Sequence, residues 1–402
     1  MSHLLAVTSR YPFGHQESYL NTELQELKQY FGQITIVPVR APDGIRRHAV
    51  PEGINVLEWP LFDTEVAVRA SAALVLRPIG CCSALAQLFA SHDPGKTKNA
   101  AIVAKGLALG QWACEHRVTH VHAYWMSTPA SVAFIAGSVA ELPWSATAHR
   151  WDIYEKNAFD VKARAATFVR TISDRATRDL RARIPSLGSR IVEIRLGARV
   201  PTLPTTGWRS SRVVLRIVCP AALVPVKGHD DVLQAITLLR SRGITVHCIF
   251  AGSGPLRPML EARARKLGLG GVVQFAGHVP QRVLHRWYRS GTVDAVVLAS
   301  RADGEMMMEG LPSALIDAMA YGVPAVVTDS GSICELMDDS CGYLVRSNSP
   351  EAIAVALARV HMDPRTAYQR ATRAYYRVKA LHDVHTQMRK LASAFLVSGG
   401  AG

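Results

Sequence analysis

Residues 309–324 have the sequence Glu309-Gly-Leu-Pro-Ser-Ala-Leu-Ile-Asp317-Ala-Met-Ala-Tyr-Gly-Val-Pro324. The apolar residues of this run recur with helical period until a Gly and a Pro end it, so we expect a helix that begins just after Glu309. Asp317 follows Glu309 by eight residues, which at about 3.6 residues per turn places both carboxylates near one face. Backbone N–H groups ahead of a helix are unpaired and favour anions. The pattern favours a ligand with hydroxyls and phosphates, such as a sugar nucleotide, although carboxylates at this spacing also occur on solvated helix faces.

Strand-like and helix-like segments alternate along the chain in two sets, which predicts two α/β domains with parallel sheets. In the first set, a helical segment from Tyr19 to Tyr30 lies between two strands. The strands predicted in this set are residues 4–7, 34–37, 54–57, 118–122, 144–148 and 167–172. The second set comprises strands 213–218, 244–251, 272–276, 293–299 and 323–328, with helices 229–242 and 255–267.

The domain boundaries follow from these two sets. We expect the first domain to span residues 1–200 and the second domain to span residues 213–375. Residues 201–212 are rich in prolines and hydroxyl side chains and form the linker candidate. The remaining residues, 376–402, complete a segment of helical period and end in a Gly-rich tail.

The composition indicates a globular chain without a membrane span. At 402 residues, 49% of them hydrophobic, the chain can bury large cores. No run approaches the roughly 20 uncharged apolar residues that a spanning helix needs. The N-terminal residues lack a basic region and are predicted to form a strand rather than a signal peptide. The seven cysteines have no metal-ligand spacing, so we expect a cytoplasmic protein.

The net charge of +14 is spread over both halves of the chain. Nucleic-acid binding predicts a concentrated basic stripe with interleaved aromatic residues, and because none is visible we expect no nucleic-acid partner. The diffuse charge fits anionic donors, an anionic membrane surface or the usage of an Arg-rich proteome. Residues 66–90, which include Arg69 and Arg77, are predicted to form a helical segment on the rim of the first domain. Because apolar residues almost surround this segment, peripheral contact with a membrane is the alternative.

Two strand-to-helix turns of the second domain carry residues suited to phosphates. Lys227 lies in Val-Pro-Val-Lys227-Gly-His, after a strand and ahead of a helix, where an ammonium group can reach phosphates gathered at the helix N-terminus. Gly252 and Gly254 follow the next strand, and glycines there allow the backbone to approach a ligand closely. A solvated lysine and a merely tight turn are the alternatives.

In the first domain, His149 follows a predicted strand within Thr-Ala-His149-Arg-Trp-Asp152-Ile. A side chain at the carboxyl end of a parallel strand points into the crevice where such sheets bind ligands. His120 and His122 lie two residues apart on another predicted strand and share a face, but they lack a third metal ligand.

These motifs resemble those of the retaining glycosyltransferases of family 4, which have the GT-B fold of two Rossmann-like domains facing each other across a cleft. The likeness is dense from about residue 213 to residue 350 and patchy before residue 200. In that family the first carboxylate of the Glu-x7-Glu region binds hydroxyls of the donor sugar and the second binds the ribose. The resemblance assigns these roles to Glu309 and Asp317, the second of which is Glu in the family. It also implies that the terminal helix crosses back onto the first domain.

The resemblance implies further donor contacts in the second domain. It assigns Lys227 to the donor diphosphate, whereas the arginine that accompanies this lysine in the family is replaced by Ala222. Arg10 and Arg257 are candidates to substitute for it. The end of the strand at residues 272–276 is expected to lie against the nucleotide base, mostly through backbone groups. The predicted donor-binding residues are Lys227, Gly252, Gly254, His278, Val279, Glu309, Gly310, Leu311, Pro312 and Asp317.

In the first domain the resemblance places His149 near the reacting sugar, so His149 and Glu309 are the predicted catalytic residues. The loop at residues 12–19 resembles a segment that faces the acceptor in polysaccharide-building members of the family. The predicted acceptor-side residues are Gly14, Glu17, His122 and Asp152. An ordinary loop with a Glu in the first turn of a helix is the alternative for Glu17.

The resemblance implies transfer of a sugar from a nucleotide diphosphate donor, a UDP- or GDP-sugar, to a hydroxyl of a glycan or lipid-linked acceptor, with retention at the anomeric carbon. Neither a metal ion nor a cofactor is expected. The expected pathway is assembly of an exopolysaccharide, a capsule or a lipid-linked glycan. The alternatives are glycosylation of a small natural product and a degenerate paralogue that binds sugar nucleotides without turnover, which the missing arginine and Asp317 would support.

Overall fold

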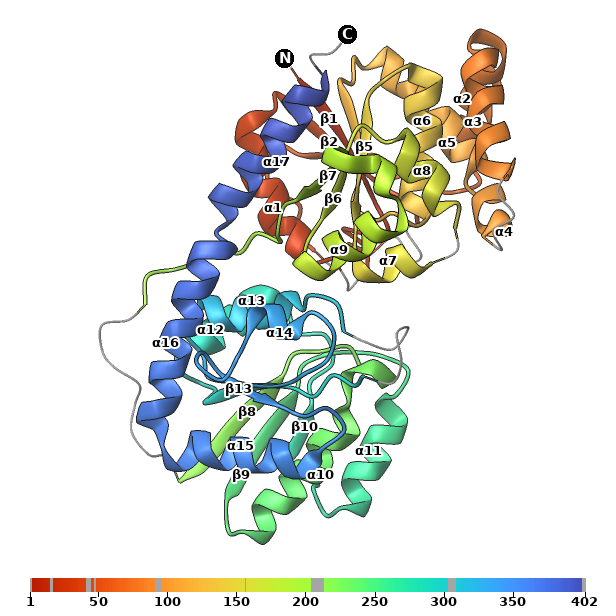
Figure 1. The fold of residues 1–402 in the computed structure, drawn as a ribbon. Coiled ribbons are helices and arrows are strands. Elements are labelled where there is room, and N and C mark those ends of the chain that lie inside the picture. Colours follow the sequence, from red (N-terminus) through yellow and green to blue (C-terminus); the bar gives the residue numbers. More distant parts are fainter. Residues whose placement is uncertain are drawn as a thin grey trace. The chain divides into compact units, whose positions relative to one another are not determined.

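The computed structural model describes residues 2–14, 17–40, 45–46, 48–90, 95–155, 157–203, 213–302 and 309–399. The chain forms two compact units (Figure 1). The first unit comprises Met1–Gly197 and Val384–Gly402, and the second comprises Ala198–Asp383. Most of the predicted linker, residues 204–212, lies outside the described residues.

The first unit is built on a sheet of seven parallel strands in the order β3-β2-β1-β4-β5-β6-β7. Its strands are β1 (His3–Thr8), β2 (Gln33–Pro38), β3 (Asn55–Val56), β4 (His120–Ala123), β5 (Trp144–Ala148), β6 (Val169–Thr171) and β7 (Ile191–Glu193). Every residue of β1 and β4 is buried, as expected for strands of a parallel sheet that is covered on both faces.

Helices cover both faces of this sheet. Its helices are α1 (Tyr19–Leu27), α2 (Thr64–Leu76), α3 (Pro78–Ala90), α4 (Lys96–Ala100), α5 (Val103–Glu115), α6 (Thr128–Ala140), α7 (Arg150–Tyr154), α8 (Phe159–Ala165), α9 (Asp174–Arg183) and α17 (Val384–Gly399). Figure 1 shows α1 and α17 on one face and α5 and α6 on the other. Because α2 packs on α5 and α3 packs on α6, these two helices form an additional layer outside the helices that cover the sheet.

The second unit has six parallel strands in the order β10-β9-β8-β11-β12-β13. They are β8 (Val214–Cys219), β9 (Thr245–Phe250), β10 (Val273–Phe275), β11 (Ala295–Leu298), β12 (Ala325–Thr328) and β13 (Tyr343–Val345). The helices are α10 (His229–Ser241), α11 (Arg257–Lys266), α12 (Gln281–Arg289), α13 (Ser313–Ala320), α14 (Ile333–Leu336), α15 (Pro350–Met362) and α16 (Pro364–Leu381). The strand order reverses between β8 and β11, and the carboxyl ends of strands at such a point form the ligand-binding crevice of doubly wound sheets.

The prediction of two α/β domains with parallel sheets is confirmed, and each predicted strand has a counterpart in one of the sheets. Two helical predictions need correction. Residues 66–90 form two helices with a 106° bend instead of one segment, because Pro78 cannot continue α2 and instead begins α3. The chain re-enters the first unit at Val384 rather than near residue 376. Helix α16 keeps Tyr375 and Val378 buried in the second unit until it ends at Leu381.

No single helix in the described part of the chain is long and apolar enough to cross a bilayer. Only the bent pair formed by α2 and α3 satisfies the length and composition requirement, and it does so when the two helices are taken together.

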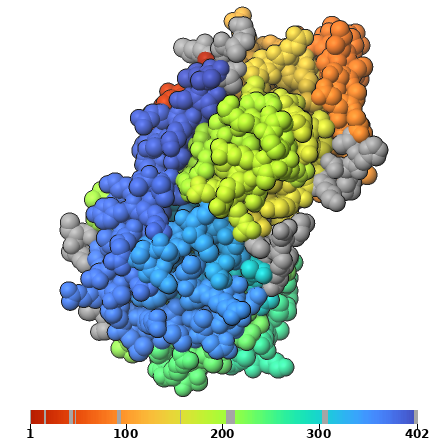
Figure 2. Space-filling view, in the orientation of Figure 1, coloured from red at the N-terminus to blue at the C-terminus, as the bar shows by residue number. Residues whose placement is uncertain are grey.

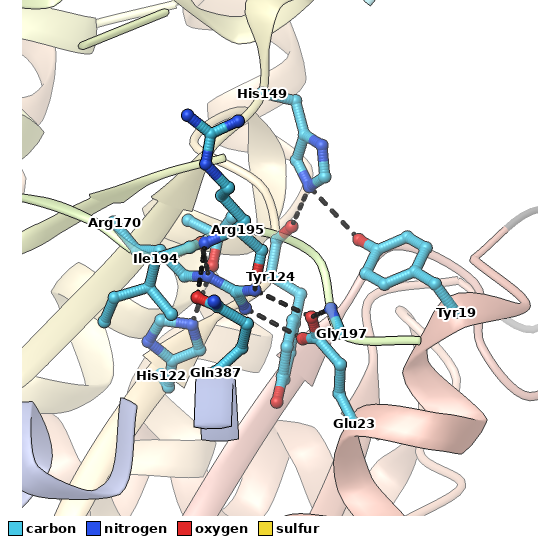
Figure 3. A network of polar contacts seen from close by, with 11 residues as sticks. Tyr19, Glu23, His122, Tyr124, His149, Arg170, Ile194, Arg195, Gly197 and Gln387 are labelled. Atoms are coloured by element: carbon cyan, nitrogen blue, oxygen red, sulfur yellow. Dashed lines mark hydrogen bonds and ion pairs between the residues drawn. The ribbon is translucent and has the colours of Figure 1, made fainter. Parts of the chain in front are cut away.

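A buried ion pair joins three parts of the first unit (Figure 3). Arg170 on β6 donates to both carboxylate oxygens of Glu23 on α1, at 2.8 and 2.7 Å, and both side chains are fully buried. The same guanidinium donates to the carbonyl oxygens of Ile194 and Arg195, at 2.8 and 2.9 Å. Glu23 also accepts from the backbone N–H of Gly197 at 3.2 Å, so the pair fixes α1, β6 and the segment after β7 to one another.

Replacing Glu23 by Gln is expected to lower the free energy of unfolding of the protein by about 3–5 kcal/mol, because the Arg170 guanidinium then lies buried without a countercharge. Urea unfolding followed by circular dichroism measures this change. The matched control is Glu65→Gln, which breaks a partly exposed pair with Arg69 and is expected to cost less than about 1 kcal/mol. Equal losses in the two variants would contradict the assignment of Glu23–Arg170 as a structural pair.

Candidate functional site

At the carboxyl edge of the second sheet, the structure brings Lys227 and Glu309 together. Lys227 ends a short 3-10 helix (Pro225–Lys227) after β8, and its Nζ forms an ion pair with Oε2 of Glu309. Ser300 lies just beyond the end of β11, and its hydroxyl donates to the same oxygen at 2.8 Å. The side chains of Lys227 and Glu309 remain 21% and 11% exposed, so a ligand can reach both. Two residues predicted from separate motifs are therefore direct neighbours.

The loop that carries Glu309 is fixed to the end of β12. The backbone N–H of Glu309 donates to the Ser330 hydroxyl at 3.1 Å, and this hydroxyl donates to the carbonyl oxygen of Arg301 at 2.6 Å. The backbone N–H of Gly310 donates to Oε1 of Glu309 at 3.2 Å. Leu311 and Pro312 are buried, and the Pro312 carbonyl oxygen accepts the backbone N–H groups of Leu315 and Ile316 in the first turn of α13, at 3.0 and 3.3 Å. As predicted, Glu309 precedes a helix, since α13 begins at Ser313.

The second predicted carboxylate, Asp317, lies inside α13 and contacts the start of α12. Its Oδ2 accepts a hydrogen bond from Gln281 Nε2 at 2.8 Å, and its Oδ1 lies 3.5 Å from His285 Nε2. Gln281 immediately follows His278, Val279 and Pro280, all partly buried, at the segment expected to lie against a nucleotide base. Gln281 was not predicted as a site residue, although its position just after residues 278–280 could have indicated it.

The glycines of the strand-to-helix turns approach the chain's own backbone. A Cβ added to Gly252 would lie 1.8 Å from the carbonyl oxygen of Ala221, and one added to Gly254 would lie 2.4 Å from that of Leu223. Both glycines were predicted to let the backbone approach a ligand. The structure shows that they allow the loop after β9 to pack against the loop after β8, as the tight-turn alternative requires. Their approach to a donor stays a prediction.

The arginine that the family pairs with Lys227 is absent at Ala222, and the structure indicates where other guanidinium groups lie. Arg257 is bonded to Glu261 at 2.7 Å and to the carbonyl oxygen of Phe275 at 3.1 Å. Arg301, which the sequence analysis did not single out, donates its backbone N–H to the carbonyl oxygen of Val226 at 2.8 Å. Its guanidinium pairs with Asp231 on α10. Of Arg257 and Arg301, it is Arg301 whose backbone bonds to the residue that precedes Lys227.

In the first unit, His149 lies at the carboxyl end of β5 and is held from three sides (Figure 3). Its Nε2 lies 3.1 Å from the Tyr19 hydroxyl and 3.2 Å from the carbonyl oxygen of Tyr124. Because a carbonyl can only accept, Nε2 carries the ring proton. The ring stacks on Trp125 with centroids 4.1 Å apart, and burial lowers the pKa of His149 to about 3. His149 is therefore a neutral, firmly oriented side chain that is 8% exposed.

Two predicted acceptor-side carboxylates instead organise this loop cluster. Glu17 is buried and accepts backbone N–H groups of Ser9, Arg10 and Tyr11, at 2.9–3.0 Å, and the Trp125 indole N–H at 2.7 Å. Oδ2 of Asp152, also buried, accepts the backbone N–H groups of His149 and Met126, at 3.0 and 3.1 Å. The prediction that these side chains face an acceptor is therefore wrong: they position the His149 and Trp125 rings. Sequence analysis missed Trp125, although it follows a strand end.

The other two acceptor-side predictions also change. His122 is fully buried, with Nδ1 2.8 Å from the Ser145 hydroxyl and Nε2 3.0 Å from the Thr147 hydroxyl, so acceptor contact through its side chain is excluded. Gly14 donates its backbone N–H to the Arg10 carbonyl oxygen at 3.0 Å, and a Cβ there would lie 2.8 Å from Arg10 Cβ. It serves a tight turn. Within the described residues, no group of three His, Cys, Asp or Glu side chains could hold a metal ion.

Comparison with known proteins supports a coarse assignment. Residues 214–377 match the family model of glycosyl transferases group 1. The amylovoran biosynthesis glycosyltransferase AmsK of Erwinia amylovora is 28% identical over 44% of this chain and 44% of its own length. The GDP-mannose-dependent alpha-(1-6)-phosphatidylinositol monomannoside mannosyltransferase of Mycolicibacterium smegmatis is 32% identical over 38% of this chain and 40% of its own length. The matched stretch thus spans less than half of each of these relatives.

Among solved structures, HepE of Anabaena in complex with UDP superposes with a TM-score of 0.69 at 17% identity, over 99% of this chain and 100% of that chain. A likeness of this extent establishes the fold. The chain therefore has the GT-B fold, with two α/β domains that each contain a parallel sheet, as the sequence predicted.

Replacing Gly252 by Ala is expected to destabilise the second domain by about 3 kcal/mol, because its Cβ would collide with the Ala221 carbonyl and overpacking costs about 1–3 kcal/mol or more. The control is Gly270→Ala, where a Cβ meets nothing within 4 Å, and its effect is expected to stay within about 0.5 kcal/mol. Thermal and urea unfolding report both. Two equally mild variants would show that the loops after β8 and β9 can separate without loss.

The buried histidines predict acid sensitivity. Burial lowers the pKa of His120 and His149 to about 3 and that of His122 well below 6.5. As the pH falls from about 6.5 the unfolded chain binds protons that the folded chain does not, so the free energy of unfolding falls. Burial raises the pKa of Asp152 from 3.8 to about 7. Between these pH values the folded chain binds the proton that the unfolded chain lacks, so Asp152 adds to the free energy of unfolding and offsets part of the loss from the histidines.

Urea unfolding at a series of pH values between 6 and 4 measures this dependence. Removing one such group with His120→Gln is expected to reduce the slope by about 1.4 kcal/mol per pH unit, the equivalent of one proton. A slope unchanged by the substitution would show that His120 titrates alike in the folded and unfolded chains.

Proposed function

We propose that this protein is a retaining glycosyltransferase that moves a hexose from a nucleotide diphosphate sugar to an acceptor hydroxyl. The observation that carries the proposal is the Lys227–Glu309 pair at the strand ends of the second domain, within the residues that match the family model. An ammonium group beside a carboxylate matches a donor in which a diphosphate adjoins sugar hydroxyls. Asp317 supplies a second acceptor for hydroxyls near the segment at residues 278–280.

The residues divide the work of donor binding by charge. Lys227 exchanges Glu309 for the donor diphosphate and stabilises the charge that develops on it as the sugar leaves. Glu309 then accepts hydrogen bonds from sugar hydroxyls, supported by the Ser300 hydroxyl. Asp317, oriented by Gln281, accepts from the ribose. Arg301 is the candidate for the second cation, because its backbone adjoins the Lys227 turn and its guanidinium can exchange Asp231 for a phosphate.

In the reaction the acceptor hydroxyl oxygen bonds to the anomeric carbon on the face from which the diphosphate departs. The bond between this carbon and the diphosphate oxygen breaks with its electron pair on that oxygen, which also receives the hydroxyl proton. His149 remains the proposed first-domain residue near the reacting sugar, where burial keeps its ring uncharged. The proposed reaction needs neither a metal ion nor a cofactor, because Lys227 and Arg301 would counter the negative charge of the leaving group.

The biological setting is proposed from the relatives. A relative named for amylovoran biosynthesis supports a place in exopolysaccharide assembly, and one named for a phosphatidylinositol monomannoside supports lipid-linked glycan assembly. The proposed location is the cytoplasm. HepE is described with UDP, and the mycobacterial relative is named as GDP-mannose-dependent, so UDP- and GDP-sugars are the donors to test. The rival function is a degenerate paralogue that binds a sugar nucleotide without transfer, favoured by Ala222 in place of the family's arginine.

A panel of UDP-, GDP-, ADP- and TDP-sugars tests the donor site through thermal stabilisation. A donor at 100 times its dissociation constant adds roughly 2.7 kcal/mol to the free energy of unfolding. We expect selective stabilisation by one donor and at least roughly tenfold weaker binding in Glu309→Gln and in Lys227→Met, each of which removes a charge-assisted hydrogen bond. Glu351→Gln, an exposed residue of α15, is the control and should bind as the unmodified protein does.

With the selected donor, the anomeric configuration of the transferred sugar, measured by NMR, tests retention, and activity in the presence of EDTA tests metal independence. Donor binding without transfer or hydrolysis would favour the degenerate paralogue. Failure of every nucleotide sugar to stabilise the folded protein would refute the donor site.

A further inference from the structure

Large apolar side chains are exposed in unusual density where α2 meets α3. Five of them form what we term the apolar corner: Val68, Leu74, Val75, Leu76 and Ile79, which are 68%, 47%, 78%, 66% and 85% exposed. Phe62, just ahead of α2, is 83% exposed. Single exposed apolar residues are ordinary, but a contiguous group marks a surface that contacts something other than water.

The corner is held in place by the opposite faces of the same helices. Val66, Ala70 and Ala73 of α2 and Cys81, Ala84 and Leu88 of α3 are buried in the core of the first domain. At Gly80 the backbone of α3 approaches α6 so closely that a Cβ would lie 2.6 Å from the carbonyl oxygen of Ser138. The 106° bend at Arg77–Pro78 therefore presents Val75 to Ile79 as a convex, rigid tip. Figure 2 shows these helices, in orange, at the outer edge of the first domain.

The charged side chains carried by the bent helix pair from residue 66 onward are both arginines. Residues 66–90 contain Arg69 and Arg77 but no Asp, Glu or Lys. Arg69 is paired with Glu65, at the start of α2, and with Glu115, at the end of α5. Arg77 lies between α2 and α3, within the corner itself. The outward face of α3 carries Cys82, Ser83 and Ala86, which are small and uncharged.

We propose that the apolar corner inserts into the interfacial region of an anionic lipid bilayer and anchors the protein there. Neither α2 nor α3 is long enough alone to span a bilayer, and the bend gathers exposed valine, leucine and isoleucine side chains where the two helices meet. Arg77 lies where its stem can stay with the lipid chains and its guanidinium can reach the headgroups. The net charge of +14 adds attraction to an anionic surface. The inference is independent of the proposed reaction and holds for any chemistry at Lys227 and Glu309.

Flotation of the full chain with vesicles tests the anchor. The vesicles contain either phosphatidylcholine alone or phosphatidylcholine mixed with phosphatidylglycerol. We expect binding to the mixed vesicles, and a loss of roughly tenfold per position in the variant Val75→Asp/Ile79→Asp. Because both side chains are more than three-quarters exposed, these changes leave the core of the protein intact. Arg77→Gln is expected to weaken binding to mixed vesicles by roughly fivefold, with little effect on neutral ones.

The matched control is Met362→Asp/Tyr376→Asp, which replaces residues of the second domain that are 70% and 61% exposed. The control is expected to bind vesicles as the unmodified chain does. The proposal is overturned if the unmodified chain does not float, or if the corner variant and the control lose binding equally. It is also overturned if light scattering finds a dimer that the corner variant converts to a monomer, since the corner would then be a self-association surface. Donor binding measured without vesicles should be unchanged in the corner variant, which separates this test from that of the donor site.

Discussion

Close contact between backbones at the carboxyl edge of the second sheet is the constraint on which the candidate donor site depends. A Cβ on Gly228 would lie 1.9 Å from the carbonyl oxygen of Ala299, and one on Gly331 would lie 1.8 Å from that of Glu309. Both glycines also have positive φ angles, which other residues rarely adopt. Only glycine therefore lets the loops after β8, β11 and β12 meet. Their meeting places Lys227 and Glu309, 82 residues apart in the sequence, in contact.

The first domain is organised differently, through polar groups that are buried and fully oriented. Helix α1 contributes Tyr19 to His149 and Glu23 to Arg170, so the histidine at the strand ends and the internal ion pair are supported by one helix. Glu17 and Asp152 accept hydrogen bonds from backbone N–H groups of the loops at the same strand ends. Hydrogen-bond networks of this kind restrict the rotamers of the groups they hold. The domain thereby presents a neutral imidazole of defined orientation and not a titrating base.

The sequence predicted most of the framework because strands of parallel sheets are short apolar runs that end at recognisable turns. It also predicted that Lys227 and Glu309 precede helices and that Asp317 lies within the second of these helices, which the structure shows. Their donor-binding roles stay predictions. It could not predict the fate of His122. Phe395 of α17 covers both His120 and His122, with ring centroids 4.8 and 5.1 Å away, and no local pattern indicates that the end of the chain will pack there.

Other differences have comparable causes. Glu17 and Asp152 were predicted to contact a ligand because both follow strand ends. A carboxylate in such a position can equally well accept hydrogen bonds from the backbone N–H groups of its own chain. Only the distances to those groups decide between the two roles. Gln281 and Trp125 belong to no motif, and their importance arises from the neighbours that folding gives them.

The Lys227–Glu309 contact has a consequence for the order in which a ligand must be accommodated. A neutral monosaccharide offers the ammonium group no replacement for the carboxylate, so it would have to compete with a full charge for the oxygens of Glu309. A diphosphate offers that replacement directly, and once it has drawn Lys227 away, the carboxylate becomes a strong acceptor with vacant lone pairs. In the proposed donor site the diphosphate would therefore bind before the sugar, and a free monosaccharide would bind weakly.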